Sequence, residues 1–387
     1  MKNSSLSQSS DRFRALACWR RRAGSASLIL LMALSGCAAR PGPETLQPVV
    51  QPAGGPVPIT LFAVTDRAPG AGTPPVPGSG RGDASYEQLM FQPRPKPSQN
   101  DGKVSGPDAD PSKDFVTTGR RLMSAPAFDA EVARLARSRD KTIMVFVHGY
   151  NYNYQEAVFR VAQLSAETGE GAVPILFSWP SDARATGYLA DRDGATYARD
   201  DLARLLIRLS EGHGERQIAV VGHSMGAWLV METLRQLRLQ GRGDVVDPLR
   251  VVLAAPDIDM DVFRRQSEVV GPLRTPMAVL VSSDDRVLGV SGSLSGGRLR
   301  VGNAPLNDPR LLAVAEQNGM RIFDITAVPA TDALNHDRYI GFAARYAAAA
   351  EDHHGGGLRR AGTYLLDATG RILSSPFDAA SRALGGS

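Results

Sequence analysis

Short apolar runs alternate with stretches of helical periodicity along most of this chain. An apolar run of about four to eight residues is typical of a buried strand, whereas apolar residues three and four positions apart are typical of a helix. The pattern predicts strands at 58–65, 142–147, 173–179, 217–221, 249–255, 277–282 and 321–328, and helices at 125–139, 153–165, 195–209 and 227–234. Continuous apolar strands between amphipathic helices predict an α/β fold, in which a mostly parallel, doubly wound sheet has helices on both faces. Ligands of such sheets bind beyond the carboxyl ends of the strands.

Stretches rich in Pro, Gly and polar residues divide the rest of the chain. Residues 37–57 are predicted to be a flexible tether, and residues 58–350 a folded domain. Within that domain, residues 68–112 carry many Pro, Gly, Asp and Ser residues and predict a long irregular insertion. Residues 351–387 are predicted to be a C-terminal tail, and the pattern assigns them to no element.

The N-terminus has the pattern of an export signal. Six Lys or Arg residues precede the apolar run 26–34, which is shorter than the roughly 17–25 residues of a membrane span. The run ends in Leu34-Ser35-Gly36-Cys37, which resembles the signal of bacterial lipoproteins. We therefore predict a lipoprotein signal peptide over 1–36 and lipidation of Cys37, the alternative being an ordinary signal peptide with an incidental cysteine. Ala38 favours, by analogy with enterobacterial sorting, anchoring in the outer membrane, facing the periplasm.

The charge and the cysteines limit the possible partners and nucleophiles. The 387-residue chain is formally +4, but from residue 37 onward it holds 38 basic and 39 acidic side chains. This near-neutral balance predicts no nucleic-acid partner. The two cysteines are Cys18, within the signal, and Cys37, so the nucleophile of the mature domain would be Ser rather than Cys. The sequence has no metal-ligand spacing and no phosphate loop, so we expect neither a metal nor a cofactor.

A serine between two glycines stands where a predicted strand meets a predicted helix. The segment is Gly222-His223-Ser224-Met225-Gly226. In a nucleophile elbow the backbone turns so sharply that side chains at the two Gly positions would clash. The serine hydroxyl is then raised over the end of the sheet, at the positive end of the helix. The motif by itself is weakly specific, but its position predicts that Ser224 is a nucleophile.

A serine nucleophile needs a base and an acid that orients the base. His336 is the histidine that follows the last predicted strand in a plausibly structured position, and Ser-acid-His is the chain order of α/β-hydrolases. The acid is expected just past the strand 277–282, where Asp284 and Asp285 are adjacent. Adjacent side chains point apart, so only one can reach the histidine; we favour Asp285 and keep Asp284 as the spare. Asp257 and Asp259 are weaker alternatives.

The oxyanion that forms on attack needs two N–H donors. One is expected from the backbone of Met225, the residue after the nucleophile. The other is expected from the loop after the strand 142–147, where Gly149 would let the backbone approach the substrate. Our choice for this second donor is the backbone N–H of Tyr150.

Five segments together resemble a known family. They are Thr65-Asp66-Arg67, Phe146-Val147-His148-Gly149-Tyr150-Asn151, Phe177-Ser178-Trp179-Pro180, Gly222-His223-Ser224-Met225-Gly226 and Leu253-Ala254-Ala255-Pro256-Asp257-Ile258-Asp259. In combination they resemble the bacterial α/β-hydrolases of the esterase/lipase superfamily called domain-of-unknown-function family nine hundred. The resemblance covers roughly residues 57–345. It implies the α/β-hydrolase fold and supports Ser224, Asp285 and His336 as a triad, but it implies no substrate.

Three functions follow from these observations. The first is a serine hydrolase that cleaves carboxylic esters through an acyl-enzyme on Ser224. The second is an acyltransferase or thioesterase with the same triad, and the third is a non-catalytic envelope protein that binds ligands on a hydrolase scaffold. The expected partners are a small-molecule or lipid ester and, through Cys37, a membrane. The sequence leaves the oligomeric state open.

Overall fold

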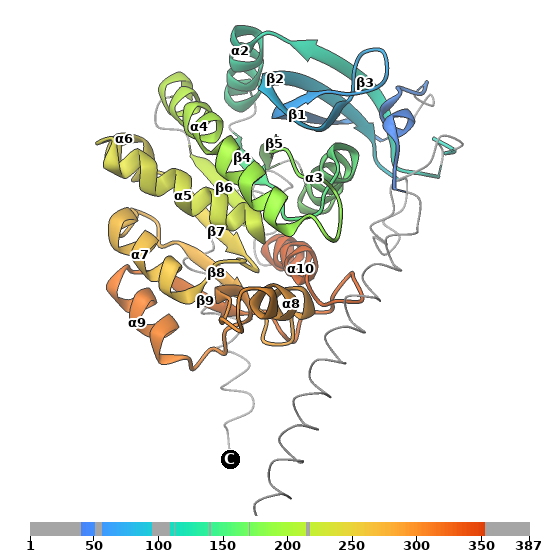
Figure 1. The fold of residues 1–387 in the computed structure, drawn as a ribbon. Helices are drawn as coiled ribbons and strands as arrows, with labels where there is room; N and C mark the ends of the chain where they lie inside the picture. The colour runs from blue at the N-terminus through green and yellow to red at the C-terminus, as the bar shows by residue number, and fades with distance from the viewer. Residues whose placement is uncertain are drawn as a thin grey trace, which may run out of the picture.

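A single mixed sheet organises the protein. The computed structural model describes residues 40–50, 56–94, 109–111, 113–138, 141–169, 171–213 and 217–352, with side chains as far as residue 345. The described strands form a nine-stranded sheet in the order β3-β2-β1-β5-β4-β6-β7-β8-β9 (Figure 1). They are β1 (Ile59–Pro69), β2 (Pro77–Gln92), β3 (Val116–Met123), β4 (Thr142–Val147), β5 (Ala172–Ser178), β6 (Ile218–His223), β7 (Arg250–Ala254), β8 (Ala278–Val281) and β9 (Arg321–Asp324). All pairs from β1 to β9 along this order are parallel, whereas β2 is antiparallel to β1 and β3.

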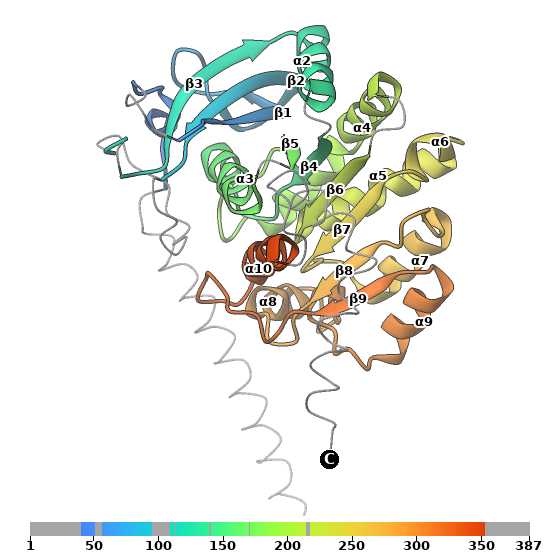
Figure 2. The same cartoon turned by 180° about the vertical axis from the view of Figure 1, so that it is seen from behind.

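Helices cover both faces of the sheet (Figures 1 and 2). One face carries α2 (Ala125–Ser138), α4 (Tyr188–His213), α5 (Met225–Leu239), α7 (Met260–Val270) and α9 (Pro309–Gln317). The other carries α3 (Tyr154–Thr168) and α10 (Arg338–Asp352). Along β4, Ile143, Val145 and Val147 pack on the first face, and Met144 and Phe146 on the second. This two-sided burial is why the central strands are continuously apolar.

Each strand and helix predicted from residue 125 to the elbow helix is present, but α4 begins seven residues before the predicted 195–209 and α5 ends five residues after the predicted 227–234. Besides the four-residue helix α6 (Gly243–Val246), four helices were not predicted: α7, α8 (Arg286–Leu294), α9 and α10. Helix α8 shows the reason, because its nine residues include Gly289, Ser291, Gly292 and Ser293, which favour turns over helices. The shorter elements η1 (Pro43–Leu46), α6 (Gly243–Val246) and η2 (Val301–Asn303) complete the described fold.

The prediction of an irregular insertion over 68–112 is wrong for residues 77–92. Residues 77–92 form the 16-residue strand β2, which pairs with β1 over most of its length and, over residues 86–92, with β3 along its other side. Its first ten residues are half-buried or exposed. An antiparallel strand can leave one face in water, so polar residues and glycines are compatible with it. The residue composition of this segment therefore did not indicate a strand.

The prediction of a flexible tether over 37–57 is wrong for residues 40–50. Within this segment, η1 buries Thr45 and Leu46. The Val49 N–H donates to the Thr117 carbonyl (2.9 Å), and the Thr117 hydroxyl donates to the Thr45 carbonyl (3.0 Å). Leu46 is 1% exposed and belongs to the core on the α3 side of the sheet. A single buried leucine and backbone pairing at an edge strand are long-range effects that the Pro-rich composition does not reveal.

Candidate active site

Ser224 stands between β6 and α5 in the geometry of a nucleophile elbow. Its φ is +56° and its ψ −120°, a strained conformation for a residue with a side chain. A Cβ on Gly222 would lie 2.7 Å from Cα of Ala227, and one on Gly226 would clash with the carbonyl oxygens of Val147 and His148. Both glycines are therefore required by close backbone approach, as the sequence predicted.

The backbone of Ser224 is tied to the neighbouring strand. Its N–H donates to the Ala254 carbonyl at the end of β7 (2.9 Å), and its carbonyl accepts from the Asp257 N–H (3.1 Å). These bonds hold the strained turn, since such conformations persist only where the surroundings fix them. Met225 is the first residue of α5, where backbone N–H groups have no acceptor within the helix. Its N–H is therefore suited to bind an oxyanion.

Asp285 and His336 are in direct contact. Oδ2 of Asp285 accepts a hydrogen bond from Nδ1 of His336 at 2.7 Å. The Asp285 side chain is completely buried, and its Oδ1 caps α8 by accepting from the Leu288 N–H (3.0 Å). A carboxylate can only accept, so Nδ1 of His336 carries the proton and Nε2 is left as the basic atom.

Asp284 points elsewhere. Its Oδ2 accepts from the Arg338 guanidinium (2.6 Å) and from the Asn335 side chain (3.0 Å), and its Oδ1 accepts from the Ser282 hydroxyl (2.8 Å). The choice of Asp285 over Asp284 as the partner of His336 thus agrees with the geometry. Asp257 and Asp259 have other partners: Asp257 pairs with the buried Arg300, and Asp259 caps α7.

The loop that carries His336 is held by Asp332, a residue that the sequence analysis missed. Oδ1 of Asp332 accepts from the N–H groups of His336 (2.9 Å) and Asp337 (3.0 Å), and Oδ2 accepts from the Leu334 N–H (3.0 Å). An Asp just ahead of a turn is the available signal, because its side chain commonly binds backbone N–H groups a few residues on. Asp332 thus fixes the backbone of the turn that carries the imidazole.

The His336 ring lies beside the elbow. Its centroid is 4.6 Å from the ring of His223, the residue directly before Ser224, and the His223 ring is 4.5 Å from that of Tyr339 on α10. Burial, with the neighbouring His336, lowers the pKa of His223 well below its ordinary value. His223 is thus a neutral packing surface for His336, and a positive charge at this position resides on His336.

Carboxylates raise the pKa of His336. Burial by itself lowers this pKa, but the contact with Asp285 and the nearby charges of Asp337 and Asp332 outweigh burial and raise it to about 9. Near neutral pH the resting imidazole is therefore mostly protonated. Its basic form becomes the major form only above about pH 9.

The loop after β4 lies against Ser224. A Cβ on Gly149 would be 2.9 Å from Cβ of Ser224, so only glycine permits this approach. His148 anchors the loop: its ring stacks on Trp179 with centroids 4.8 Å apart, and Nε1 of Trp179 donates to the His148 carbonyl (2.8 Å). Burial and Arg67 lower the pKa of His148 to about 3, so this histidine is structural and neutral. Tyr150, the proposed second oxyanion donor, is the next residue of the loop.

Arg67 links the loops around the site. This residue is 2% exposed, and its guanidinium donates to the Ser178 hydroxyl (3.0 Å), the Ser181 carbonyl (3.1 Å), the Tyr152 carbonyl (2.9 Å) and the Gly78 carbonyl (3.0 Å). Burial lowers its pKa to about 10, which leaves it charged at neutral pH. The Thr65-Asp66-Arg67 motif was noticed in the sequence without a role for Arg67. One buried cation satisfies acceptors from three separate segments.

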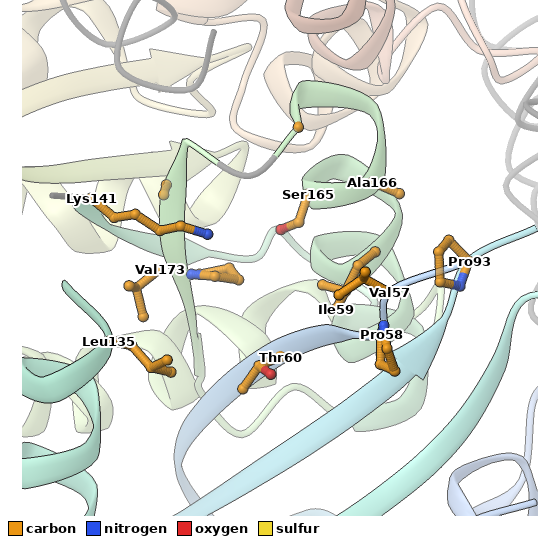
Figure 3. Close-up of a pocket in the computed structure, with 13 residues that line it drawn as sticks. Val57, Pro58, Ile59, Thr60, Pro93, Leu135, Lys141, Ser165, Ala166 and Val173 are labelled. Atoms are coloured by element: carbon orange, nitrogen blue, oxygen red, sulfur yellow. The ribbon is translucent and has the colours of Figure 1, made fainter. Parts of the chain in front are cut away.

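A pocket of about 260 Å³ lies at the opposite edge of the sheet (Figure 3). It is lined by the first residues of β1 and β5, by Lys141 just before β4 and by Ser165 of α3. These strands run in parallel, so their first residues and the Ser224 edge are at opposite ends. The pocket is therefore separate from the candidate site.

Other sequence expectations concern metals and membranes. Among the described residues, no group of three or more His, Cys, Asp and Glu side chains could hold a metal ion. No helix in the described part of the chain has the length and apolarity to cross a membrane. The predicted signal peptide, Cys37 and nearly all of the C-terminal tail lie outside the described residues.

Residues 124–348 match the family described as "Alpha/beta hydrolase of unknown function (DUF900)". The chain belongs to this family. The parallel sheet with an elbow after β6 agrees with that fold, and the family and fold expected from the five sequence segments are confirmed. The chain also matches the uncharacterized protein alr1448 of Nostoc sp. (strain PCC 7120), with 27% identity over 129 residues. That match covers 27% of this chain and only 33% of the Nostoc protein.

Solved structures with partial similarity are hydrolases and esterases. A putative hydrolase from Agrobacterium vitis S4 has 15% identity and a TM-score of 0.31, covering 72% of this chain and 95% of its own. An esterase of Pyrobaculum calidifontis has 14% identity and a TM-score of 0.31, and the match covers 73% of this chain and 81% of the esterase. A structure from a study of two Rhizomucor miehei esterases has 11% identity and a TM-score of 0.29, and the match covers 70% of this chain and 74% of that structure's chain.

Proposed function

We propose that this α/β-hydrolase is a serine carboxylester hydrolase that acts through an acyl-enzyme on Ser224. The observation that carries the proposal is the 2.7 Å contact between Asp285 and His336, beside an elbow that holds Ser224 at a φ of +56°. A buried carboxylate, an oriented imidazole and a strained serine at one sheet edge are the parts that acyl transfer requires.

In the proposed reaction, Nε2 of His336 takes the proton of the Ser224 hydroxyl as Oγ attacks the ester carbonyl carbon. The carbonyl oxygen becomes an oxyanion, which the N–H groups of Met225 and Tyr150 bind. The intermediate collapses to the acyl-enzyme as His336 returns the proton to the leaving alcohol. Water then attacks the acyl-enzyme with His336 as base, which releases the carboxylic acid and restores Ser224. Asp285 holds the Nδ1 proton and stabilises the imidazolium throughout.

The proposal is tested with a short-chain p-nitrophenyl ester and a fluorophosphonate probe. We expect the wild-type protein to hydrolyse the ester and to be labelled on the peptide that contains Ser224. Ser224→Ala should lose labelling and lower kcat by about 10⁶-fold. Wild-type protein that neither reacts with the probe nor turns over any ester in a panel of acyl lengths would refute the proposal and favour a binding role.

We further propose that Cys37 is lipidated, that the protein is held at the cell envelope and that its substrates include membrane-lipid esters. The support is the Leu34-Ser35-Gly36-Cys37 segment and the position of Arg40, which contacts the loop after β4. Three residues span at most about 11 Å, so a lipid on Cys37 would hold this edge of the sheet close to the membrane surface. Metabolic labelling of wild type but not of Cys37→Ser with a fatty-acid probe tests the anchor. Sensitivity of processing to globomycin provides a second test.

A further inference from the structure

Arg40, in the segment expected to be a flexible tether, contacts the loop that follows β4. Its Nη1 donates to the Asn151 carbonyl (3.0 Å) and to Oε2 of Glu156 (2.8 Å), and its Nη2 donates to Oδ1 of Asn151 (2.7 Å). Both acceptors of Asn151 are thus bound by one guanidinium. The planar fork of arginine suits this pair of acceptors, and a carboxylate strengthens its bonds.

Asn151 directly follows Tyr150 and has a left-handed backbone conformation. Its φ is +64°, in the left-handed region. Its N–H donates to Oδ2 of Asp191 (2.9 Å), so this peptide group is fixed from the α4 side while Arg40 fixes the carbonyl and the side chain. Asparagine adopts this region more readily than other residues with a side chain, and Asp191 and Arg40 together hold Asn151 there from two sides.

We propose that Arg40 is a positioning residue for the hydrolase reaction: by clamping Asn151 it holds the adjacent Tyr150 N–H where the oxyanion forms. The inference rests on the proposed function, because it assigns a role in that reaction. The active site is then built partly by residues only three positions after Cys37, outside the segment that matches the family. A chain that lacks this segment would keep the triad but lose the support of one oxyanion donor.

The other residues of the segment 40–50 contact the folded domain without Arg40, so a substitution of Arg40 can be tested without displacing the whole segment. The Asn153 side chain donates to the Pro41 carbonyl (3.0 Å), and Leu46 is buried in the core. Asn153 and Glu156 also cap α3 through reciprocal bonds to each other's backbone N–H; Oε2 of Glu156 accepts both from the Asn153 N–H (2.9 Å) and from Arg40, so the capping bonds remain when Arg40 is replaced. Replacing Arg40 should therefore free the carbonyl and the side chain of Asn151, whose N–H stays bound to Asp191, without unfolding the segment or the helix.

The experiment compares the full-length wild type with Arg40→Ala, Arg40→Lys and the control Arg264→Ala, which removes an exposed ion pair with Glu268. Each protein is assayed with a p-nitrophenyl ester and with a trifluoromethyl ketone inhibitor, whose adduct with Ser224 carries an oxyanion. For Arg40→Ala we expect kcat to fall about 10- to 100-fold with KM changed less than threefold, and ketone binding to weaken by the same factor as kcat/KM. Arg40→Lys should recover only part of the activity, because an ammonium cannot reproduce the fork. The control should match wild type.

Two results would overturn the inference. One is an Arg40→Ala protein with kcat within twofold of wild type. The other is a loss of activity without weaker ketone binding, which would indicate a general structural effect. If Arg40→Ala is unfolded by circular dichroism, Arg40→Lys decides by the same two measurements. An inactive wild type that also fails to react with fluorophosphonate would instead refute the proposed function.

Discussion

The carboxylate of Asp285 accepts the Nδ1 proton of His336 at 2.7 Å, whereas its neighbour Asp284 binds Arg338 on the outside of the same turn. Two adjacent aspartates therefore have different tasks. Asp285→Asn keeps the shape but presents an amide to Nδ1, which favours the wrong tautomer of the imidazole. We expect kcat to fall by about 10⁴-fold with little change in KM. Steady-state kinetics with a p-nitrophenyl ester measures this.

Asp284→Asn is the matched control for that prediction, because it changes the same chemical group one residue away. We expect it to lower kcat less than tenfold. Equal losses in the two variants would contradict the assignment of Asp285 to His336.

The raised pKa of His336 predicts an alkaline activity profile. The imidazole must be neutral to accept the Ser224 proton, and with a pKa of about 9 the neutral fraction rises with pH through this value. We expect kcat/KM to increase up to about pH 9. Asp332 and Asp337 contribute to the raised pKa, so Asp337→Asn should move the profile towards lower pH. A profile that is flat from pH 6 to 9 would argue against His336 as the base.

The close approach of Gly149 to Ser224 predicts a steric effect. Gly149→Ala would place a methyl group 2.9 Å from Cβ of Ser224, so either the serine or the loop must move. A misplacement of about 1 Å in an active site can cost about 10²-fold in rate, and we expect a loss of this order in kcat. Gly212→Ala is the control, since a Cβ there meets nothing within 4 Å. Full activity of Gly149→Ala would show that this loop does not contribute to the reaction.

Arg67 is expected to stabilise the fold as well as the site. Arg67→Met keeps the length and apolar stem but leaves carbonyl acceptors of Ser181, Tyr152 and Gly78 without their donor. Unpaired buried groups cost about 1–3 kcal/mol each, so the free energy of unfolding should fall by about 3 kcal/mol or more. Chemical denaturation measures it, with Arg264→Met as a surface control expected to change stability by less than about 1 kcal/mol. A loss of under 1 kcal/mol for Arg67→Met would refute this role.

Asp66 is expected to destabilise the fold as its carboxyl ionises. Neither carboxylate oxygen has a hydrogen-bond partner in the described part of the chain, and burial together with Asp201 raises the pKa of Asp66 from 3.8 to about 7. Ionisation is thus easier in the unfolded chain, so this group lowers stability as the pH rises from about 4 to 7, and its effect is constant above pH 7. Asp66→Asn removes this ionisable group. The amount by which the variant exceeds the wild type in free energy of unfolding should be up to about 4 kcal/mol larger near neutral pH than at pH 4. Denaturant unfolding at both pH values checks this, and an equal effect at the two would contradict it.

Much of the fold could be predicted because the signals are local. The apolar run 142–147 predicts β4 with its bounds intact, since a strand buried on both faces needs apolar residues throughout. The glycines at 222 and 226 predict the elbow because only glycine tolerates the backbone contacts there. The strand β2 was not predicted and shows where local signals are insufficient. Its polar, Gly-containing residues form a strand because they pair with β1, and no local feature of the sequence indicates this pairing.

The sequence by itself determined the alternation of strands and helices, the elbow at Ser224 and a short set of candidates for its acid and base. Only the tertiary structure decided that Asp285 rather than Asp284 meets His336, that Asp332 and Arg67 fix the surrounding loops, and that Arg40 reaches Asn151 across 111 positions of chain. The reason is physical. A strand, a turn or a cap depends on neighbours a few residues away, whereas the direction of a side chain and the partner of a buried charge depend on segments that meet only when the sheet has assembled.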